Sequence, residues 1–219
     1  MSERKTVTLK CSKCGNLHNT EAYSSINVGE SPELKEAVCN GSAFTWECPH
    51  CGSLNLIQSP VLYHDPGRSL MIWLYGPQPL PEDRIKSLFA TDESLKAYTA
   101  RLVDSIGDLI EKVKIFDAEL DDMGMEMCKY VTRMELIGNC SDPARKEAIR
   151  TAPIKFLRID GADSDITLAY PLDSQMQMVN VGFNVYEDCL GILRRNPSIK
   201  EEATGLVRID AGWLSRYFR

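Results

Sequence analysis

The stretches Cys11-Ser-Lys-Cys14-Gly15 and Cys48-Pro-His-Cys51-Gly52 are two Cys-x-x-Cys turns, each closed by a glycine, with 33 residues between Cys14 and Cys48. A Cys-x-x-Cys turn aims two sulfurs at one point, and two facing turns complete the tetrahedron of a structural zinc site. No coordination position is then left for a substrate. The spacing predicts a zinc-ribbon-like β domain in which one structural Zn²⁺ is held by Cys11, Cys14, Cys48 and Cys51.

Redox chemistry and coincidence are the two alternatives to zinc. A dithiol redox site normally uses a single pair at a helix N-terminus within a βαβ unit, whereas both pairs here flank expected strands. Structural zinc also suits the energetics, because it contributes about 10–16 kcal/mol to small domains that bury little apolar core. The paired cysteines therefore favour a metal site.

Four further cysteines are widely separated in the sequence: Cys39, Cys128, Cys140 and Cys189. A free cysteine is usually a small buried hydrophobe, and we expect that role for them. Cys39 lies inside the expected metal domain and is left open as a substitute ligand. His18 and His50 are close to the cysteine turns, where we expect them to support the ligands or to face solvent.

The composition is that of a globular protein, with 43% hydrophobic and 26% charged residues and a net charge of −6. Residues 76–140 are the acidic part, with 8 basic and 13 acidic side chains, and no segment has the Lys and Arg cluster that nucleic-acid binding needs. No apolar signal segment precedes the first cysteine turn, and no apolar run approaches the roughly 20 residues of a membrane span. We therefore expect a cytoplasmic protein. The cytoplasm is reducing, so paired thiols there are expected to bind metal rather than to form disulfides.

In the N-terminal part, residues 17–28 and 43–47 are expected to be extended, with a short helix inserted between them. Ser31 is placed to cap this helix, Pro32 to occupy its first position, and Asn40-Gly41 to end it. Residues 54–63 and 70–75 are expected to form a hairpin around the turn Asp65-Pro66-Gly67-Arg68. The inserted helix explains the long interval between the cysteine turns.

Three prolines between residues 77 and 81 indicate a linker at residues 77–82, which divides the chain into a metal domain at 1–76 and an α+β domain at 83–219. The second domain is expected to begin with a helical hairpin. Its first helix covers about 104–118, with Leu102 assigned to the same apolar face, and Asp121 starts its second helix. Strands at 154–159, 166–170, 178–183 and 205–209 and helices at 185–194 and after Asp210 are expected to follow.

The chain resembles the CpXC family, a zinc-ribbon family of bacteria and archaea named for its cysteine turns. Besides the cysteines, the residues that carry the resemblance are Ser25-Ile26-Asn27-Val28, Pro32-Glu33-Leu34-Lys35, Leu62-Tyr63-His64-Asp65, Ile115-Phe116-Asp117-Ala118, Leu120-Asp121-Asp122, Tyr186-Glu187, Ile209-Asp210 and Trp213. The first turn has Ser12 where the family has proline, which supplies no ligand. The family is an uncharacterised one, so the resemblance implies no substrate or partner.

His64 beside Asp65 is the best candidate for a catalytic pair, because a carboxylate can orient a histidine that acts as a general base. Neighbouring strand residues point to opposite faces, however, and Asp65 stands where a turn needs a capping carboxylate. A structural role is favoured for both residues.

Further features have both a functional and a structural explanation. The acidic residues Asp117, Glu119, Asp121 and Asp122 could bind a divalent cation, but helix capping is the simpler explanation. The methionines Met123, Met127 and Met134 suit either a core or an adaptable binding surface. The aromatic residues Tyr23, Trp46 and Tyr63 could stack on bases, but without nearby cations they suit a core.

These features together predict a zinc-stabilised scaffold or protein-interaction module. Another protein is the expected partner, nucleic acid is disfavoured, no membrane is involved, and a homo-oligomer is left open. No P-loop, nucleophile elbow or His-Glu-x-x-His motif is present. The alternatives are a hydrolase-like enzyme that uses His64 and Asp65 and a nucleic-acid-binding zinc-ribbon regulator.

Overall fold

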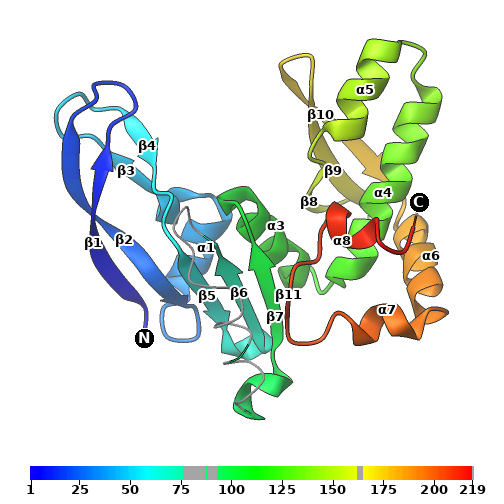
Figure 1. Cartoon of the computed structure of the whole chain (residues 1–219), viewed down its shortest axis with the longest axis horizontal. Coiled ribbons are helices and arrows are strands. Elements are labelled where there is room, and N and C mark those ends of the chain that lie inside the picture. The colour runs from blue at the N-terminus through cyan, green and yellow to red at the C-terminus, as the bar shows by residue number, and fades with distance from the viewer. Residues whose placement is uncertain (76–86, 88–92, 162–164, 219) are drawn as a thin grey trace. The chain divides into compact units, whose positions relative to one another are not determined.

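The structure is a computed structural model that describes residues 1–75, 87, 93–161 and 165–218 (Figure 1). The chain folds into two compact units. The first comprises Met1–Ile110 and Thr204–Arg208, and the second comprises Glu111–Ala203 and Ile209–Arg219. No helix among the described residues is long and apolar enough to cross a membrane.

Both units combine helices and strands, which confirms the predicted α+β class. The first unit contains a six-stranded sheet in the order β1-β2-β5-β6-β7-β11 and a two-stranded sheet of β3 and β4. The strands are β1 (Glu3–Lys10), β2 (Leu17–Asn27), β3 (Thr45–Glu47), β4 (Leu54–Leu56), β5 (Val61–Asp65), β6 (Leu70–Leu74), β7 (Thr99–Val103) and β11 (Leu206–Val207). The helical elements are α1 (Glu33–Cys39), the first residues of α3 (Ile106–Asp117), and the 3₁₀ turns η1 (Ser42–Phe44), η2 (Pro66–Arg68) and η3 (Glu93–Ala97).

The predicted hairpin around Asp65 is present as β5 and β6, in the middle of the large sheet. Both strands alternate buried and half-buried residues, and Tyr63 and Ile72 are fully buried. The Asp65 carboxylate accepts a hydrogen bond from the Arg68 amide at 3.3 Å and pairs with the Lys35 ammonium at 2.9 Å. Asp65 therefore ties the turn to α1.

Three local expectations for the first unit differ from the structure. The stretch expected as one strand at residues 54–63 is divided into β4 and β5, and β4 pairs with β3. Helix α1 has no side-chain cap: the Ser31 carbonyl accepts from Leu34, while its hydroxyl lies 3.4 Å from the Ser2 hydroxyl. Leu102 belongs to strand β7 rather than to the following helix, because the pairing of β7 with β6 outweighs a short apolar pattern.

The expected linker at residues 77–82 lies outside the described residues. Strand β7, which follows it in the chain, pairs in parallel with β6, and β11 pairs in parallel with β7. The domain ranges 1–76 and 83–219 stay a prediction from the sequence, and the first compact unit extends to Ile110 and includes Thr204–Arg208.

The second unit contains the three-stranded antiparallel sheet β10-β9-β8 and most of the helices. Its elements are the rest of α3, then α4 (Asp122–Asn139), α5 (Pro143–Thr151), β8 (Lys155–Asp160), β9 (Asp165–Leu172), β10 (Gln175–Val181), α6 (Phe183–Arg194), α7 (Pro197–Glu201) and α8 (Ala211–Leu214). Helix α4 packs against α5, α6 and α8. Helix α5 is not among the expected elements, although Asp142 caps it and Pro143 occupies its first turn.

The methionines of α4 are divided between core and surface. Met123 and Met127 are buried, as is Met125, whereas Met134 is 52% exposed. The first two turns of α4 are buried all round, because α6 and α8 also pack against this helix. Most of the predicted methionine stripe is therefore core.

Candidate metal centre

Each cysteine turn closes an antiparallel hairpin. The first turn joins β1 to β2, and the second joins β3 to β4. In both, the amide of the glycine after the second cysteine donates to the carbonyl of the first cysteine: Gly15 to Cys11 at 3.0 Å and Gly52 to Cys48 at 2.8 Å. Both glycines have positive φ, 74° and 66°, a conformation that side chains disfavour. The repeated glycine therefore sets the shape of each turn.

The fold brings the two turns face to face, and the four thiol sulfurs all lie within 4.8 Å of one another. Two of these approaches are between the turns: Cys11 Sγ lies 3.7 Å from Cys51 Sγ, and Cys14 Sγ lies 3.7 Å from Cys48 Sγ. A disulfide would need about 2.05 Å. A tetrahedral zinc site with Zn–S bonds of about 2.3 Å has sulfur–sulfur edges of about 3.8 Å, so these sulfurs fit a zinc ion.

Two polar side chains that the sequence analysis did not identify support the sulfurs. The Ser53 hydroxyl lies 3.1 Å from Cys11 Sγ and 3.3 Å from Cys51 Sγ. The Asn55 amide nitrogen lies 3.7 Å from Cys11 Sγ, and its oxygen accepts from the Ser12 amide and hydroxyl at 2.9 and 2.7 Å. Asn55 thereby links the two turns.

Asn55 could not have been found from the local pattern. It is 8% exposed, whereas its neighbours Leu54 and Leu56 are 69% and 60% exposed. An alternating Leu-Asn-Leu strand would ordinarily bury its leucines. Here Asn55 is opposite Trp46 on the face that carries the cysteines, so the requirements of the metal centre reverse the usual preference.

The sulfurs favour a bound cation. Hydrogen bonds from the Ser53 hydroxyl and the Cys14 amide lower the pKa of Cys11 to about 5, and Ser53 also lowers the pKa of Cys51. The pKa of Cys14 rises to about 11, because burial and the neighbouring thiols outweigh the Asn16 amide. A metal cation provides the positive charge that lets all four thiols ionise together.

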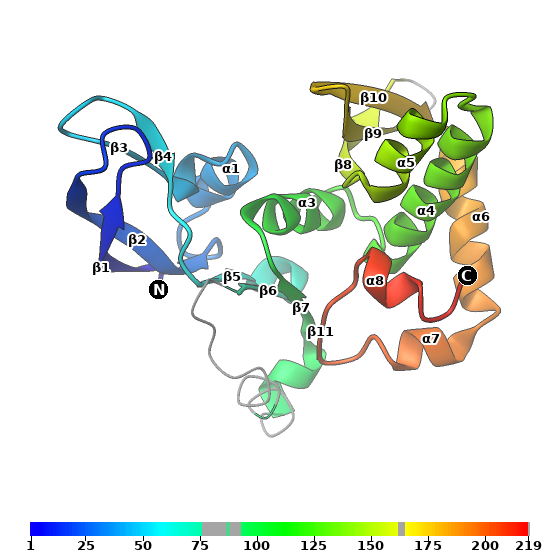
Figure 2. The same cartoon turned by 45° about the horizontal axis from the view of Figure 1, so that its top comes forward.

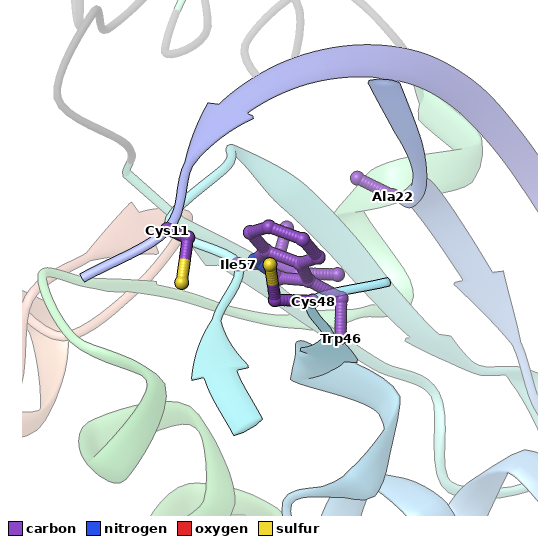
Figure 3. Packing of buried hydrophobic residues seen from close by; sticks show 5 residues of the cluster. All are labelled: Cys11, Ala22, Trp46, Cys48 and Ile57. Carbon is purple, nitrogen blue, oxygen red and sulfur yellow. The ribbon is translucent and has the colours of Figure 1, made fainter. Parts of the chain in front are cut away.

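The centre has a small apolar core of its own (Figure 3). Cys11 and Cys48 are each 1% exposed and pack with Ala22, Trp46 and Ile57. Trp46 also has the His18 ring at 5.9 Å between centroids. Trp46 is thus the core residue that the sequence suggested, and its burial depends on the cysteine turns.

The other residues that the sequence suggested as possible metal ligands or supports are not part of the four-cysteine cluster. Among the described residues, the cluster of potential ligands contains the four cysteines and neither Cys39, His18 nor His50. His50 is exposed on the second turn, and Cys39 ends α1.

The side chains of His64 and Asp65 lie on opposite sides of β5. The His64 Nε2 atom lies 3.1 Å from the Tyr98 hydroxyl, and burial lowers the pKa of this histidine. Asp65 is on the opposite, buried side of β5, where it holds Arg68 and Lys35. Each side chain therefore has partners of its own, Tyr98 for His64 and Arg68 with Lys35 for Asp65.

The acidic residues at the start of α4 do not assemble a cation site among the described residues. Asp121 caps α4 by accepting from the amides of Met123 and Gly124 at 2.8 and 3.0 Å, as predicted. Asp122 does more than favour the helix dipole, because its carboxylate is 1% exposed and pairs with Lys112 at 2.9 Å.

Asp122 and Lys112 belong to a buried ion network in the second unit that the sequence did not indicate. The Lys129 ammonium lies 2.9 Å from Glu111 and 2.7 Å from Glu126, and Glu111 also accepts from Lys155 at 2.8 Å and from the Phe156 amide at 2.8 Å. Three carboxylates are matched by three ammonium groups. The network joins α3, α4 and β8 electrostatically.

The comparisons with known proteins agree with the cysteine arrangement. No curated protein and no solved structure matches the chain. The model of the family described as CpXC protein matches residues 9–129, which is more than half of the 219 residues and includes all four cysteines. With its four thiols gathered as potential metal ligands, the chain belongs to the CpXC family.

Proposed function

We propose that this protein is a zinc-stabilised protein-interaction module. In this proposal one Zn²⁺ ion occupies the four-cysteine centre and has a structural role. The observation that carries it is the geometry of the sulfurs, whose 3.7 Å approaches match the edges of a zinc–thiolate tetrahedron. Four protein ligands leave no coordination position for a substrate, so the ion holds two hairpins together and performs no chemistry.

The surface around the centre supports protein binding. Leu17 and Leu54 each follow the second cysteine of a turn by three residues, and they are 67% and 69% exposed. Leu56, on the same face of β4 as Leu54, is 60% exposed. We call these three residues the knuckle leucines. Large apolar side chains that are exposed next to a rigid centre are typical of a surface that a protein partner covers.

A cavity next to Leu56 adds to this support. Its volume is about 520 Å³, and Leu56, Leu74, Tyr75 and Ile106 contribute to its lining within the first unit. An apolar side chain of a partner that covers the knuckle leucines could enter this cavity, where it would be removed from water. The proposed interface therefore has both a projecting part and a recess.

The experiment is affinity purification from the native organism with three tagged chains. We expect a protein to be retained by the wild type and to be lost from the double variant Leu54→Ser/Leu56→Ser. The matched control is Met134→Ser, another exposed apolar residue, which should retain the partner. All three should keep their zinc. Equal sets of proteins on the wild type and the double variant would refute the proposed surface, and absence of zinc from the wild type would refute the centre.

A further inference from the structure

The edge strand β10 differs from the other sheet edges of the described residues. Strand β10, Gln-Met-Gln-Met-Val-Asn-Val, has seven residues, no charged residue, no proline and no irregularity in its pairing. Its two methionines, Met176 and Met178, are 62% and 65% exposed. Natural sheets protect their edges from pairing with other chains by charge, bulges or shortness. Strand β10 has none of these protections.

The opposite edge of the same sheet is protected. Strands β10 and β8 are the two edges (Figure 2). Strand β8 carries Lys155, Arg158 and Asp160, and it has a bulge between Phe156 and Arg158. The Phe156 amide is also occupied, since it donates to the Glu111 carboxylate.

The edges of the other described sheets are protected as well. Edge strand β1 has four charged residues and a register irregularity at its start, and β11 has two residues. Strands β3 and β4 have three residues each. The open character of β10 is therefore specific to this strand and not a general property of the chain.

The turn before β10 determines which of its backbone groups face outward. Asp173 and Ser174 form a two-residue loop with φ of 51° and 62°, which is the pattern of a type I′ hairpin. In such a hairpin the closing pair, Leu172 and Gln175, exchanges backbone hydrogen bonds, and bonded pairs then alternate along the ladder. The backbone N–H and C=O groups of Met176, Met178 and Asn180 consequently point away from β9.

From these observations we infer that β10 is a dimerisation edge, which pairs in antiparallel fashion with β10 of a second copy of this chain. A two-fold axis at Met178 makes Met178 exchange both backbone bonds with its own copy, and Met176 exchange them with Asn180. On the exposed face, Met178 then meets Met178, and Met176 meets Asn180. No charge faces a like charge in this register, so the edge is complementary to itself.

The length of the edge determines the strength of the dimer. Seven residues at about 3.4 Å each make an edge of about 24 Å. A single strand edge buries less area than the roughly 1,200 Å² at which stable interfaces begin, so the dimer is a weak one that forms as the concentration rises. In this dimer the three-stranded sheets of the two copies join into one continuous sheet.

Sedimentation equilibrium over a wide concentration range tests this inference. The wild type should show a monomer–dimer equilibrium. Met178→Lys places two ammonium groups opposite each other at the axis and should weaken dimerisation by about tenfold or more, as should Met178→Glu, because like charges that meet across an interface cost several kcal/mol. The matched control Met134→Lys adds the same charge at an exposed methionine of α4 and should dimerise as the wild type does.

A mixture of the Met178→Lys and Met178→Glu chains provides the decisive measurement. Since Met178 faces its own copy, the mixture should recover the dimer that each variant lacks alone, which an unfolded variant could not do. A wild type that stays monomeric at the highest concentration, a Met178→Lys chain that dimerises normally, or a mixture that remains monomeric would each overturn the inference.

Discussion

Replacement of Cys48 by serine should remove the metal and open the region around it. A serine hydroxyl is not a thiolate ligand, and at this 1% exposed position it would be left beside the remaining sulfurs. A structural zinc ion contributes about 10–16 kcal/mol, and the whole net stability of a domain is about 5–15 kcal/mol. Loss of one ligand therefore removes enough free energy to unfold the structure that depends on the ion.

The extent of unfolding follows from what else holds each element. Strands β3 and β4 have three residues each and cannot persist alone, so Trp46, 6% exposed, should become accessible. Exposure of an indole of roughly 200 Å² forfeits about 5 kcal/mol more. Tyr63 and Ile72 in the large sheet are fully buried independently of the cysteines, and β5 and β6 should stay folded.

The assay combines zinc content with tryptophan fluorescence. The Cys48→Ser chain should bind no zinc, should lack the thiolate-to-cobalt bands of a cobalt-loaded wild type, and should emit at longer wavelength. The matched control is Cys39→Ser. Cys39 lies in the same compact unit but is not one of the four clustered cysteines, so this variant should keep its zinc. A Cys48→Ser chain with one zinc ion and an unchanged emission spectrum would refute the assignment of the centre.

Three further predictions concern the second unit and are tested by urea unfolding. Lys129→Met removes the ammonium group that pairs with both Glu111 and Glu126, which leaves three carboxylates of the network with two ammonium groups. It should lower the free energy of unfolding by about 3–5 kcal/mol, so a neutral result would contradict the ion network. Although burial opposes it, Lys129 and Lys155 lower the pKa of Glu111 in the folded protein. The free energy that the ionised Glu111 contributes to folding is present above the pKa of this carboxyl in the unfolded chain and is lost as the pH falls through its pKa in the folded chain. Glu111→Gln should therefore reduce the fall in stability on acidification. Gly124→Ala puts a Cβ 2.6 Å from Leu190 Cδ2 and should cost about 1–3 kcal/mol, whereas Gly138→Ala in the same helix has open space and should gain up to about 1 kcal/mol.

Much of the local structure could be predicted because its signals are local. The turn at Asp65, the cap of α4 at Asp121 and the cap of α8 at Asp210 are each set by a side chain that bonds to amides within three residues. The Asp142-Pro143 signal for α5 is equally local, although the sequence analysis does not include it. Such contacts need no knowledge of the rest of the fold.

The sequence-based prediction failed for strand β7, where contacts with segments distant in the sequence determine the secondary structure. Strand β7 is a strand because it lies between β6 and β11, and its apolar residues alone suggested the start of a helix. The parallel pairing of β7 with β6 also joins segments that precede and follow the run of prolines in the sequence, and the prolines alone do not indicate it.

The candidate ligands of the metal centre can be identified from the sequence alone, since Cys-x-x-Cys-Gly encodes the shape of each turn over five residues. The folded chain was needed to learn which sulfurs approach across the turns and that Ser53 and Asn55 support them. It was also needed to find that the lysines and carboxylates of α3, α4 and β8 neutralise one another in the interior. The same cause explains each case: an interaction within a turn is set by neighbouring residues, whereas burial and charge pairing are set by segments that only the fold brings together.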